Sequence, residues 1–287
     1  MERNDTVFDR ITRSYYELSA SERKIGDYVI AHRGKARVQS ISELAAASLV
    51  SEATVTRFCR KLGYRGYNAF RQAVGEGLEA HERLSPETVE EVHDDDSFSD
   101  VCRKLHASHV DILTRTLELV RPENYIRAAD ILERSRRVMC MGQGGSMIIA
   151  EEAAHIFATT SGKYYAVSDS HTQTIAAATM DTDDAILFFS YSGSTMDMMD
   201  TLRSARKRGG RVILVTHYPD APGAALADVV LQCGENEDPL QLGSIGARIA
   251  QLFLIDILFS EVCRRNLDEV RERRSIMTNA ISMKSLP

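Results

Sequence analysis

No run of apolar residues in this 287-residue sequence approaches the length of about 20 that a membrane-spanning helix needs. The first residues also lack the basic stretch and the following apolar stretch of a secretory signal peptide. Both absences argue against an exported or membrane-embedded protein. We therefore expect a protein that stays in the cytoplasm and has no membrane partner.

The five cysteines include no Cys-x-x-Cys pair, and their number is odd. Structural zinc sites use such closely spaced cysteines, and a disulfide framework uses an even number of them. Neither kind of site is indicated here. We expect reduced cysteines that mostly pack in the protein interior, and no bound metal.

Basic residues are in excess in the first 80 residues, and acidic residues are in excess in the remainder of the chain. Residues 1–80 carry 13 Lys and Arg against 10 Asp and Glu, whereas the remainder carries 22 against 31, so a net charge of −6 hides a basic N-terminal part. An excess of this kind suits an element that faces DNA phosphates, although a solvated basic helix face would give the same counts. The excess is greatest in residues 51–71, with Arg57, Arg60, Lys61, Arg65 and Arg71 against Glu52.

The first 80 residues favour short helices with abrupt ends, because they show no strand-like alternation. Serine side chains can cap helix beginnings, and glycines mark two of the ends. The predicted helices are 20–33, which Ser19-x-x-Glu22 begins and Gly34 ends; 41–47, which Ser40-x-x-Glu43 begins; and 52–62, which Ser51 begins and Gly63 ends.

The last two of these helices have the apolar spacing of a helix-turn-helix motif, a motif that three-helix folds without DNA affinity also contain. Leu49 occupies the turn position where glycine is commonest because φ is positive, so we expect a shifted or mildly strained turn. Arg57 is the best candidate for a guanine contact, and Arg60, Lys61 and Arg65 are better placed for phosphates. The candidate DNA-binding residues are Ser51, Thr54, Thr56, Arg57, Arg60, Lys61 and Arg65.

Residues 84–100 contain Pro86 and seven acidic residues without Lys or Arg, which is typical of a solvated linker. Repulsion of DNA is an alternative role for these acids. A helix over about 100–134 is predicted next, with its pattern interrupted at Pro122.

From residue 137 onward, short apolar runs alternate with longer helical stretches such as Met147–Thr160, Thr195–Arg208 and Ile245–Arg264. This alternation predicts a parallel sheet covered by helices. The fold class is therefore an all-α N-terminal helix-turn-helix domain plus an α/β C-terminal domain with a five-stranded parallel sheet. The predicted strands are Val138–Met141, Tyr164–Val167, Ala185–Ser190, Val212–Thr216 and Val229–Cys233.

Two of these strands run into turns that suit an anion, 142–146 and 190–195. Such turns expose backbone amides at a helix N-terminus, and glycine allows close approach. Hydroxyls and amides without Lys or Arg suit a phosphomonoester that is readily released, although one such turn alone would most often be a helix cap. Met147 stands where a dinucleotide fingerprint needs its third glycine, so we expect no nucleotide cofactor.

Residues 50–67 resemble the N-terminal domain of the RpiR family of bacterial sugar-metabolism regulators. The resemblance rests on Val50-Ser-x-x-Thr-Val-x-Arg-Phe58 followed by Lys61-Leu-Gly-Tyr64, with Leu49 as the discordance. Residues 138–263 resemble a sugar isomerase (SIS) domain, although Ala221 stands where many relatives have Ser before Pro. The matching residues are Gly142-x-Gly-x-Ser146, Ser190-x-Ser-Gly-x-Thr195, Thr216, Ala227-Asp228 and Arg248-x-Ala-Gln-x-x-x-Ile-Asp256.

The resemblance implies a DNA-binding domain over 1–80, an acidic linker and connecting helix over 81–125, a phosphosugar-binding SIS domain over 126–267 and a tail over 268–287. Double-stranded operator DNA, a sugar-phosphate effector and a second or further copy of the chain are the implied partners, in a homodimer or tetramer that the final helix helps to build. The implied phosphosugar site consists of Gly142, Gly144, Ser146, Ser190, Ser192 and Thr195, with His171 as a sugar contact unless it is a surface histidine or a helix cap.

An alternative is a phosphosugar isomerase or lyase, because SIS domains also occur in enzymes. Such chemistry needs a positioned base, and Glu151, Glu152, His155 and His171 are the residues that could supply one. No motif pairs them, and an isomerase has no use for a helix-turn-helix. We therefore expect a regulator and no enzyme.

Overall fold

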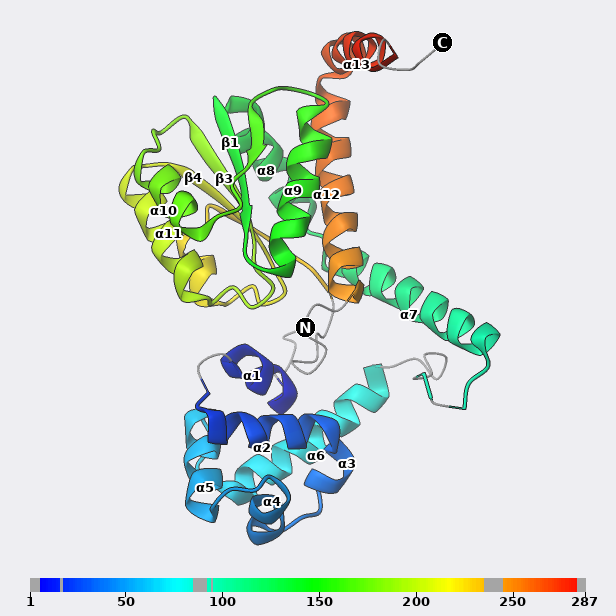
Figure 1. Cartoon of the computed structure of the whole chain (residues 1–287), viewed down its shortest axis with the longest axis vertical. Helices are drawn as coiled ribbons and strands as arrows, with labels where there is room; N and C mark the ends of the chain where they lie inside the picture. Colours follow the sequence, from blue (N-terminus) through cyan, green and yellow to red (C-terminus); the bar gives the residue numbers. More distant parts are fainter. Residues whose placement is uncertain (1–5, 16–17, 85–91, 94, 235–244, 283–287) are drawn as a thin grey trace. The chain divides into compact units, whose positions relative to one another are not determined.

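The computed structural model describes residues 6–15, 18–84, 92–93, 95–234 and 245–282 (Figure 1). The chain divides into two compact units between Asp111 and Ile112, inside a single helix. Each unit has its own hydrophobic core. In the part of the chain that is described, no helix is both long enough and apolar enough to span a membrane.

The first unit is helical, as predicted. Its aromatic core pairs Phe58 edge-on with Phe70, their ring centroids 5.6 Å apart, and both side chains are buried. Its helices are α1 (Val7–Ser14), α2 (Ala20–Ala31), α3 (Arg33–Ala36), α4 (Ile41–Ala47), α5 (Glu52–Lys61), α6 (Tyr67–Leu84) and the first part of α7 (Phe98–Leu119).

The capping residues of the first unit correctly predicted where three of its helices begin. The side chains of Ser19 and Ser40 form the predicted capping boxes at α2 and α4, and Ser51 caps α5 by accepting from the backbone N–H of Thr54. Gly63 follows α5 with a φ of +87°, as its predicted role at the helix end requires. The predicted end at Gly34 is wrong, because α2 ends at Ala31 and Gly34 lies inside α3.

The second unit is built on a parallel sheet with strand order β2-β1-β3-β4-β5. Its strands are β1 (Arg137–Gly142), β2 (Tyr164–Ala166), β3 (Asp184–Phe189), β4 (Arg211–Thr216) and β5 (Val229–Gln232), which confirms the five predicted strands within a residue or two. Its other elements are α8 (Pro122–Arg134), α9 (Gly145–Ala158), α10 (Ser170–Ala178), α11 (Met196–Lys207), the 3₁₀ helix η2 (Pro222–Leu226), α12 (Ile245–Arg265) and α13 (Leu267–Ser282).

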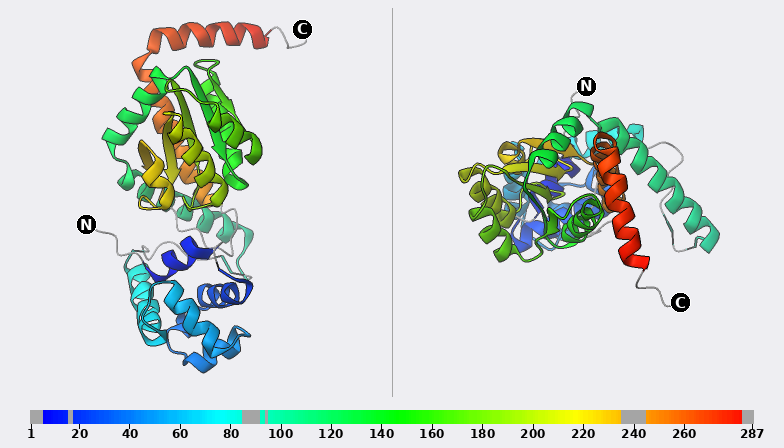
Figure 2. Two further views of the ribbon diagram at one scale, coloured as in Figure 1. Left: turned by 90° about the vertical axis from the view of Figure 1, so that its left-hand side faces the viewer. Right: turned by 90° about the horizontal axis from the view of Figure 1, so that it is seen from above.

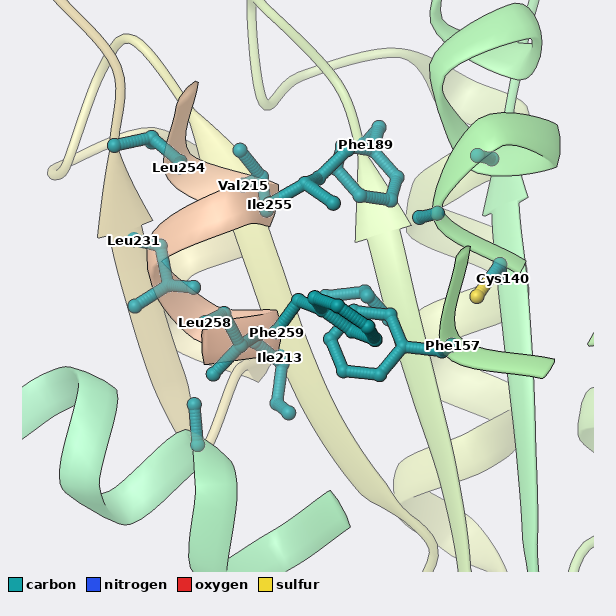
Figure 3. Close-up of a cluster of buried hydrophobic side chains, with 14 of the residues drawn as sticks. Cys140, Phe157, Phe189, Ile213, Val215, Leu231, Leu254, Ile255, Leu258 and Phe259 are labelled. Carbon is teal, nitrogen blue, oxygen red and sulfur yellow. The ribbon is translucent and has the colours of Figure 1, made fainter. Parts of the chain in front are cut away.

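Helices cover both faces of this sheet. Alternate strand residues point to opposite faces: Cys140 packs with α8, α9 and α12, whereas Met139 and Met141 pack with α10 and α11. In the left view of Figure 2, α10 and α11 lie in front of the sheet and α12 lies behind it. Figure 3 shows Phe157 of α9 and Phe259 of α12 meeting over the strands; their ring centroids are 5.4 Å apart.

The region around Pro122 contains two helices where the sequence pattern indicated one interrupted helix. α7 ends at Leu119 and α8 begins at Pro122, because proline lacks an N–H and fits the first turn of a helix. After α12 the chain continues as α13, in a tail for which a helix and a frayed end were both open from the sequence.

Candidate functional sites

The turn between α4 and α5 has the backbone conformation that its position demands. Leu49 has a φ of +54°, the only positive φ among the described residues other than glycine. The backbone N–H of Val50 donates to Ala45 O at 2.9 Å and closes the turn. The Leu49 side chain is 81% exposed, so little packing offsets the strain of this conformation.

The N-terminal turn of α5 orients an arginine. Arg57 Nη2 donates to Thr54 Oγ1 at 3.3 Å, and Thr54 Oγ1 lies 2.9 Å from Ser51 Oγ. Thr54, a candidate DNA contact near the start of this helix, is buried with 8% of its surface exposed. Its hydroxyl instead holds the guanidinium of Arg57, which is itself exposed.

The remaining candidate DNA contacts differ in their surroundings. Arg60 and Arg65 are exposed, and Thr56 is half-buried with its hydroxyl donating to Glu52 O at 3.0 Å. Lys61 Nζ lies 3.3 Å from a carboxylate oxygen of Glu22 in α2. Partial burial acts to raise the pKa of Glu22, but hydrogen bonds from Ser19 and Lys61 outweigh it and lower the pKa. The charge of Lys61 is thus partly compensated within the unit.

In the second unit, the sheet brings the two predicted anion turns together. β1 and β3 are neighbouring parallel strands, and Gly142 is paired in register with Phe189, so both strands end at the same edge. Thr195 Oγ1 donates to Gln143 Oε1 at 3.1 Å and joins the two turns directly. The strand order reverses between β1 and β3, and in parallel α/β sheets ligands bind at such a point.

The first turn needs its glycines. A Cβ on Gly142 would lie 2.6 Å from the carbonyl oxygen of Ser146, and Gly144 has a φ of +55° just before α9 begins. Buried Gln173 of α10 supports the turn, because its Nε2 donates to Gly142 O and to Val167 O, each at 2.8 Å. The segment from Asp169 to Gln173 resembles a region that often lines the sugar end of the site in the SIS family, but only His171 was singled out there as a contact.

The second turn is largely enclosed. Ser190 and Ser192 are buried, and Ser190 Oγ accepts from the backbone N–H of Gly193 at 3.2 Å. Gly193 has a φ of +60°, and a Cβ there would lie 2.6 Å from Cβ of Ala221. The alanine that departs from the common Ser-Pro pattern therefore packs against this turn.

An arginine from a distant part of the sequence approaches the first turn. Arg248 near the start of α12 has its Nη2 atom 3.6 Å from the position that a Cβ would take at Gly145. This corrects the expectation of a site without Lys or Arg. A guanidinium there adds positive charge to the amides at the start of α9.

The other polar candidates lie on helix surfaces. His171 is exposed in the first turn of α10, whose N-terminus Asp169 caps by accepting from the backbone N–H of Thr172 at 2.8 Å. The hydrogen bonds from Thr172 lower the pKa of Asp169. Among the described residues, no hydrogen bond or ion pair joins the exposed charged or titratable side chains of α9 to either turn; these side chains are Glu151, Glu152 and His155.

Comparisons with known proteins match the two units separately and together. A family model described as the helix-turn-helix domain of the rpiR family matches residues 6–81, and one described as the SIS domain matches residues 131–261. The HTH-type transcriptional regulator RpiR of Escherichia coli K12 is 27% identical over 252 residues, covering 88% of this chain and 84% of the relative. The regulator HexR of Pseudomonas aeruginosa is 29% identical over 263 residues, covering 91% of each chain.

A solved structure has the same two-part fold. The Vibrio vulnificus NanR protein complexed with ManNAc-6P matches 98% of this chain and 100% of its own, with a TM-score of 0.63 and 24% sequence identity. The helical region and the α/β domain therefore follow one another in that chain as they do here.

Proposed function

The chain belongs to the RpiR family of HTH-type transcriptional regulators that carry a SIS domain, and from this premise we propose that it binds operator DNA under the control of a sugar phosphate. The observation that carries the effector half of the proposal is the hydrogen bond from Thr195 to Gln143, which joins two amide-rich turns at one sheet edge. We keep 1–80, 81–125, 126–267 and 268–287 as the proposed domain limits.

For the DNA half, α5 enters the major groove. Arg57, held by Thr54, donates to a guanine edge, because a guanidinium can make two hydrogen bonds to guanine O6 and N7. The exposed cations Arg60 and Arg65 contact phosphates, and Ser51 and Thr56 add hydroxyl contacts at the helix start. We assign Lys61 a weaker phosphate contact, because it shares its charge with Glu22.

For the effector half, the phosphate lies between the two turns. Backbone amides at the N-termini of α9 and α11 and the hydroxyls of Ser146, Ser190, Ser192 and Thr195 donate to it, while Gly142 and Gly144 let it approach the backbone. Arg248 adds a positive charge, and His171 contacts the sugar. The ManNAc-6P complex of the NanR protein supports a sugar phosphate as the ligand class.

Control follows from differential affinity. A ligand that binds one arrangement of a dimer better than another shifts the population toward that arrangement, and the spacing of two recognition helices changes with it. A two-fold operator requires at least a homodimer, and separate contacts through each domain could build a tetramer. We propose α12 as part of the dimer contact.

We propose that the chain is a regulator and not an isomerase or lyase, and that it works in the cytoplasm, where operator DNA is found. Relatives along nearly the whole chain are named transcriptional regulators, which supports this proposal. Within the described part of the chain, no motif or contact combines the exposed carboxylates and histidine of α9 into a positioned acid and base.

A thermal-shift panel of sugar phosphates, each paired with its unphosphorylated sugar, tests the proposal. A ligand at 100 times its dissociation constant stabilises the folded protein by about 2.7 kcal/mol. We expect a shift with one or two phosphorylated sugars and none with their free sugars. Equal shifts with both members of each pair would contradict the proposed phosphate site. If none of the compounds in the panel shifts the melting temperature, the proposed sensor role is wrong.

A further inference from the structure

An aromatic cluster adjoins the second turn and has no part in the site described above. The ring of Tyr191, which stands between Ser190 and Ser192, stacks on His217 with centroids 5.0 Å apart and planes inclined by 8°. Tyr218 meets the same imidazole edge-on at 4.6 Å. His217 and Tyr218 are both buried. We call Tyr191, His217 and Tyr218 the aromatic cluster.

The backbone of the turn is tied to the same residues. The carbonyl oxygen of Tyr191 accepts from the backbone N–H of His217 at 3.1 Å and from Thr216 Oγ1 at 3.0 Å. Both the main chain and the ring of Tyr191 are therefore held by residues at the end of β4. Close-packed interiors transmit small displacements, so a shift of Tyr191 must be accommodated by His217.

On its other side, His217 is tied to the chain that leaves β5. Its Nδ1 lies 3.0 Å from Cys233 O, and a carbonyl can only accept, so Nδ1 carries the proton. Gln232 Nε2 donates to His217 O at 3.1 Å, which fixes the same segment a second time. His217 is thus bonded or stacked to the second turn at one end and to the segment after β5 at the other.

The next residue after this segment touches α7. A Cβ on Gly234 would lie 3.1 Å from the Cα atom of Thr116 and 3.0 Å from Leu119, so only a glycine allows the backbone to approach the helix this closely. Thr116 is fully buried, and its hydroxyl donates to Ile112 O at 2.7 Å. Gly234 therefore packs on the part of α7 that begins with Ile112.

α7 is the helix in which the chain passes from one compact unit to the other. It runs without a break from Phe98 to Leu119, and the division between the units falls between Asp111 and Ile112. A change in the packing of its last two turns acts on an element that continues into the first unit. Since helices are stiff, such a change alters how that element leaves the second unit.

We propose that His217 is a positioning residue that couples occupancy of the second turn to α7. A sugar phosphate bound at residues 190–195 shifts Tyr191, His217 passes the shift to Cys233 and Gly234, and Gly234 changes the packing of Thr116. This inference rests on the proposed function, because the effector must bind at the second turn. The inference assigns a role to His217, which contacts neither the sugar phosphate nor the DNA. His217 is needed for binding of the sugar phosphate to change the binding of DNA.

Hydrogen exchange of the full chain, with and without inorganic phosphate as the probe, tests the coupling. In the unsubstituted protein we expect phosphate to slow exchange in residues 190–195 and also in residues 112–119. His217→Phe keeps a ring for Tyr191 but loses the donor to Cys233 O, and His217→Asn keeps a donor but loses the stack. Both variants should retain the phosphate effect at 190–195 and lose it at 112–119.

Phe157→Leu is the matched control, because it loosens a buried aromatic contact with Phe259 in the same core, and the ring contacts of Phe157 are with Tyr164 and Phe259 and not with the cluster. It should retain both phosphate effects. Gly234→Ala acts at the far end, where its Cβ meets Thr116 directly. It should retain the phosphate effect at 190–195 and lose it at 112–119, so it tests the coupling if the His217 variants do not fold.

The outcomes separate the two proposals. An α7 response that persists in both His217 variants, or that disappears equally in Phe157→Leu, would overturn the coupling and leave the phosphate site standing. A phosphate effect at 190–195 without any effect at 112–119 in the unsubstituted protein would also overturn it. Failure of phosphate to protect residues 190–195 would remove the proposed effector site, and the coupling with it.

Discussion

The hydroxyl of Thr195 donates a hydrogen bond of 3.1 Å to Gln143 Oε1, so the turn after β3 is fastened to the turn after β1. Thr195→Val keeps the shape of the side chain and removes both this bond and a hydroxyl for the ligand. A hydrogen bond contributes about 1 kcal/mol, so we expect the affinity for the sugar phosphate to fall by roughly thirtyfold when both are lost. Isothermal titration with the best ligand of the thermal-shift panel measures the change.

Thr179→Val is the control for that titration. Thr179 Oγ1 donates to Ile175 O and Ala176 O at the end of α10, so this variant removes a comparable hydroxyl outside the two turns. Its affinity should match that of the unsubstituted protein. Equal losses in the two variants would mean that Thr195 has no specific part in binding the effector.

Arg57 and Arg65 should affect DNA binding in different ways. Arg57→Ala removes a base contact, and we expect a loss of about 1–3 kcal/mol of discrimination at one base pair, with non-specific binding nearly retained. Arg65→Ala removes a phosphate contact, so it should weaken all sequences alike and reduce the slope of log K against log salt by about 0.9. Fluorescence anisotropy with operator and scrambled duplexes over a salt series separates the two effects.

Thr54→Val tests whether the buried hydroxyl orients Arg57. The substitution keeps the volume of the side chain and removes the acceptor for Arg57 Nη2. We expect discrimination to be lost at the same base pair as in Arg57→Ala, but by a smaller amount, because the guanidinium is still present. Full discrimination in Thr54→Val would show that Arg57 needs no such support, and a loss larger than that of Arg57→Ala would indicate damage to the helix itself.

Leu49 carries strain that glycine should relieve. Leu49→Gly removes the Cβ that a φ of +54° crowds, and little buried surface is lost because the side chain is 81% exposed. We expect the free energy of unfolding to rise by about 1 kcal/mol in urea denaturation. Val38→Gly is the control, because Val38 is 74% exposed and has no positive φ. Glycine at this position should only add entropy to the unfolded state and so lower the free energy of unfolding. A loss of stability in Leu49→Gly would contradict the assignment of strain.

The features that could be predicted most clearly from the sequence are those determined by residues close together in the chain. The capping boxes at Ser19 and Ser40 depend on residues three positions apart, and the positive φ at Leu49 follows from the turn of the motif. Gly34 was misjudged because a glycine near the end of an apolar pattern looks the same whether it ends a helix or lies within a short one. Local signals do not decide between those two cases.

The parts of the site that escaped prediction are brought together by the tertiary fold. Arg248 reaches the first turn from more than a hundred residues away in the chain, and Gln173 is buried beneath it only because α10 packs on the sheet. Thr54 was named as a candidate DNA contact from its position near the start of α5, and its burial depends on how that helix packs against its neighbours. Spacing along one helix cannot supply any of these three contacts.

Acid should weaken the second unit through Asp184 at the start of β3. Its carboxylate is fully buried and accepts a hydrogen bond from Arg137. This hydrogen bond lowers the pKa of Asp184, and the backbone N–H of Asp181 and the charge of Arg136 lower it further, although burial acts to raise it. A carboxyl with a lowered pKa in the folded state adds stability that is fully present above its unfolded pKa of about 3.9. That stability is lost as the pH falls below this value and through the folded pKa.

Asp184→Asn should therefore lower the free energy of unfolding by about 2 kcal/mol at neutral pH, because a hydrogen bond to a charged group is lost. The difference from the unsubstituted protein should shrink as the pH falls through the lowered pKa, where the native carboxyl also becomes neutral. Urea denaturation between neutral pH and the acid limit measures both curves. Asp181→Asn is the control, since the Asp181 side chain is 61% exposed and its pairs with Arg136 and Arg208 contribute little in water. A pH-independent difference between Asp184→Asn and the unsubstituted protein would mean that the lost stability comes from packing and not from the charge of this carboxylate.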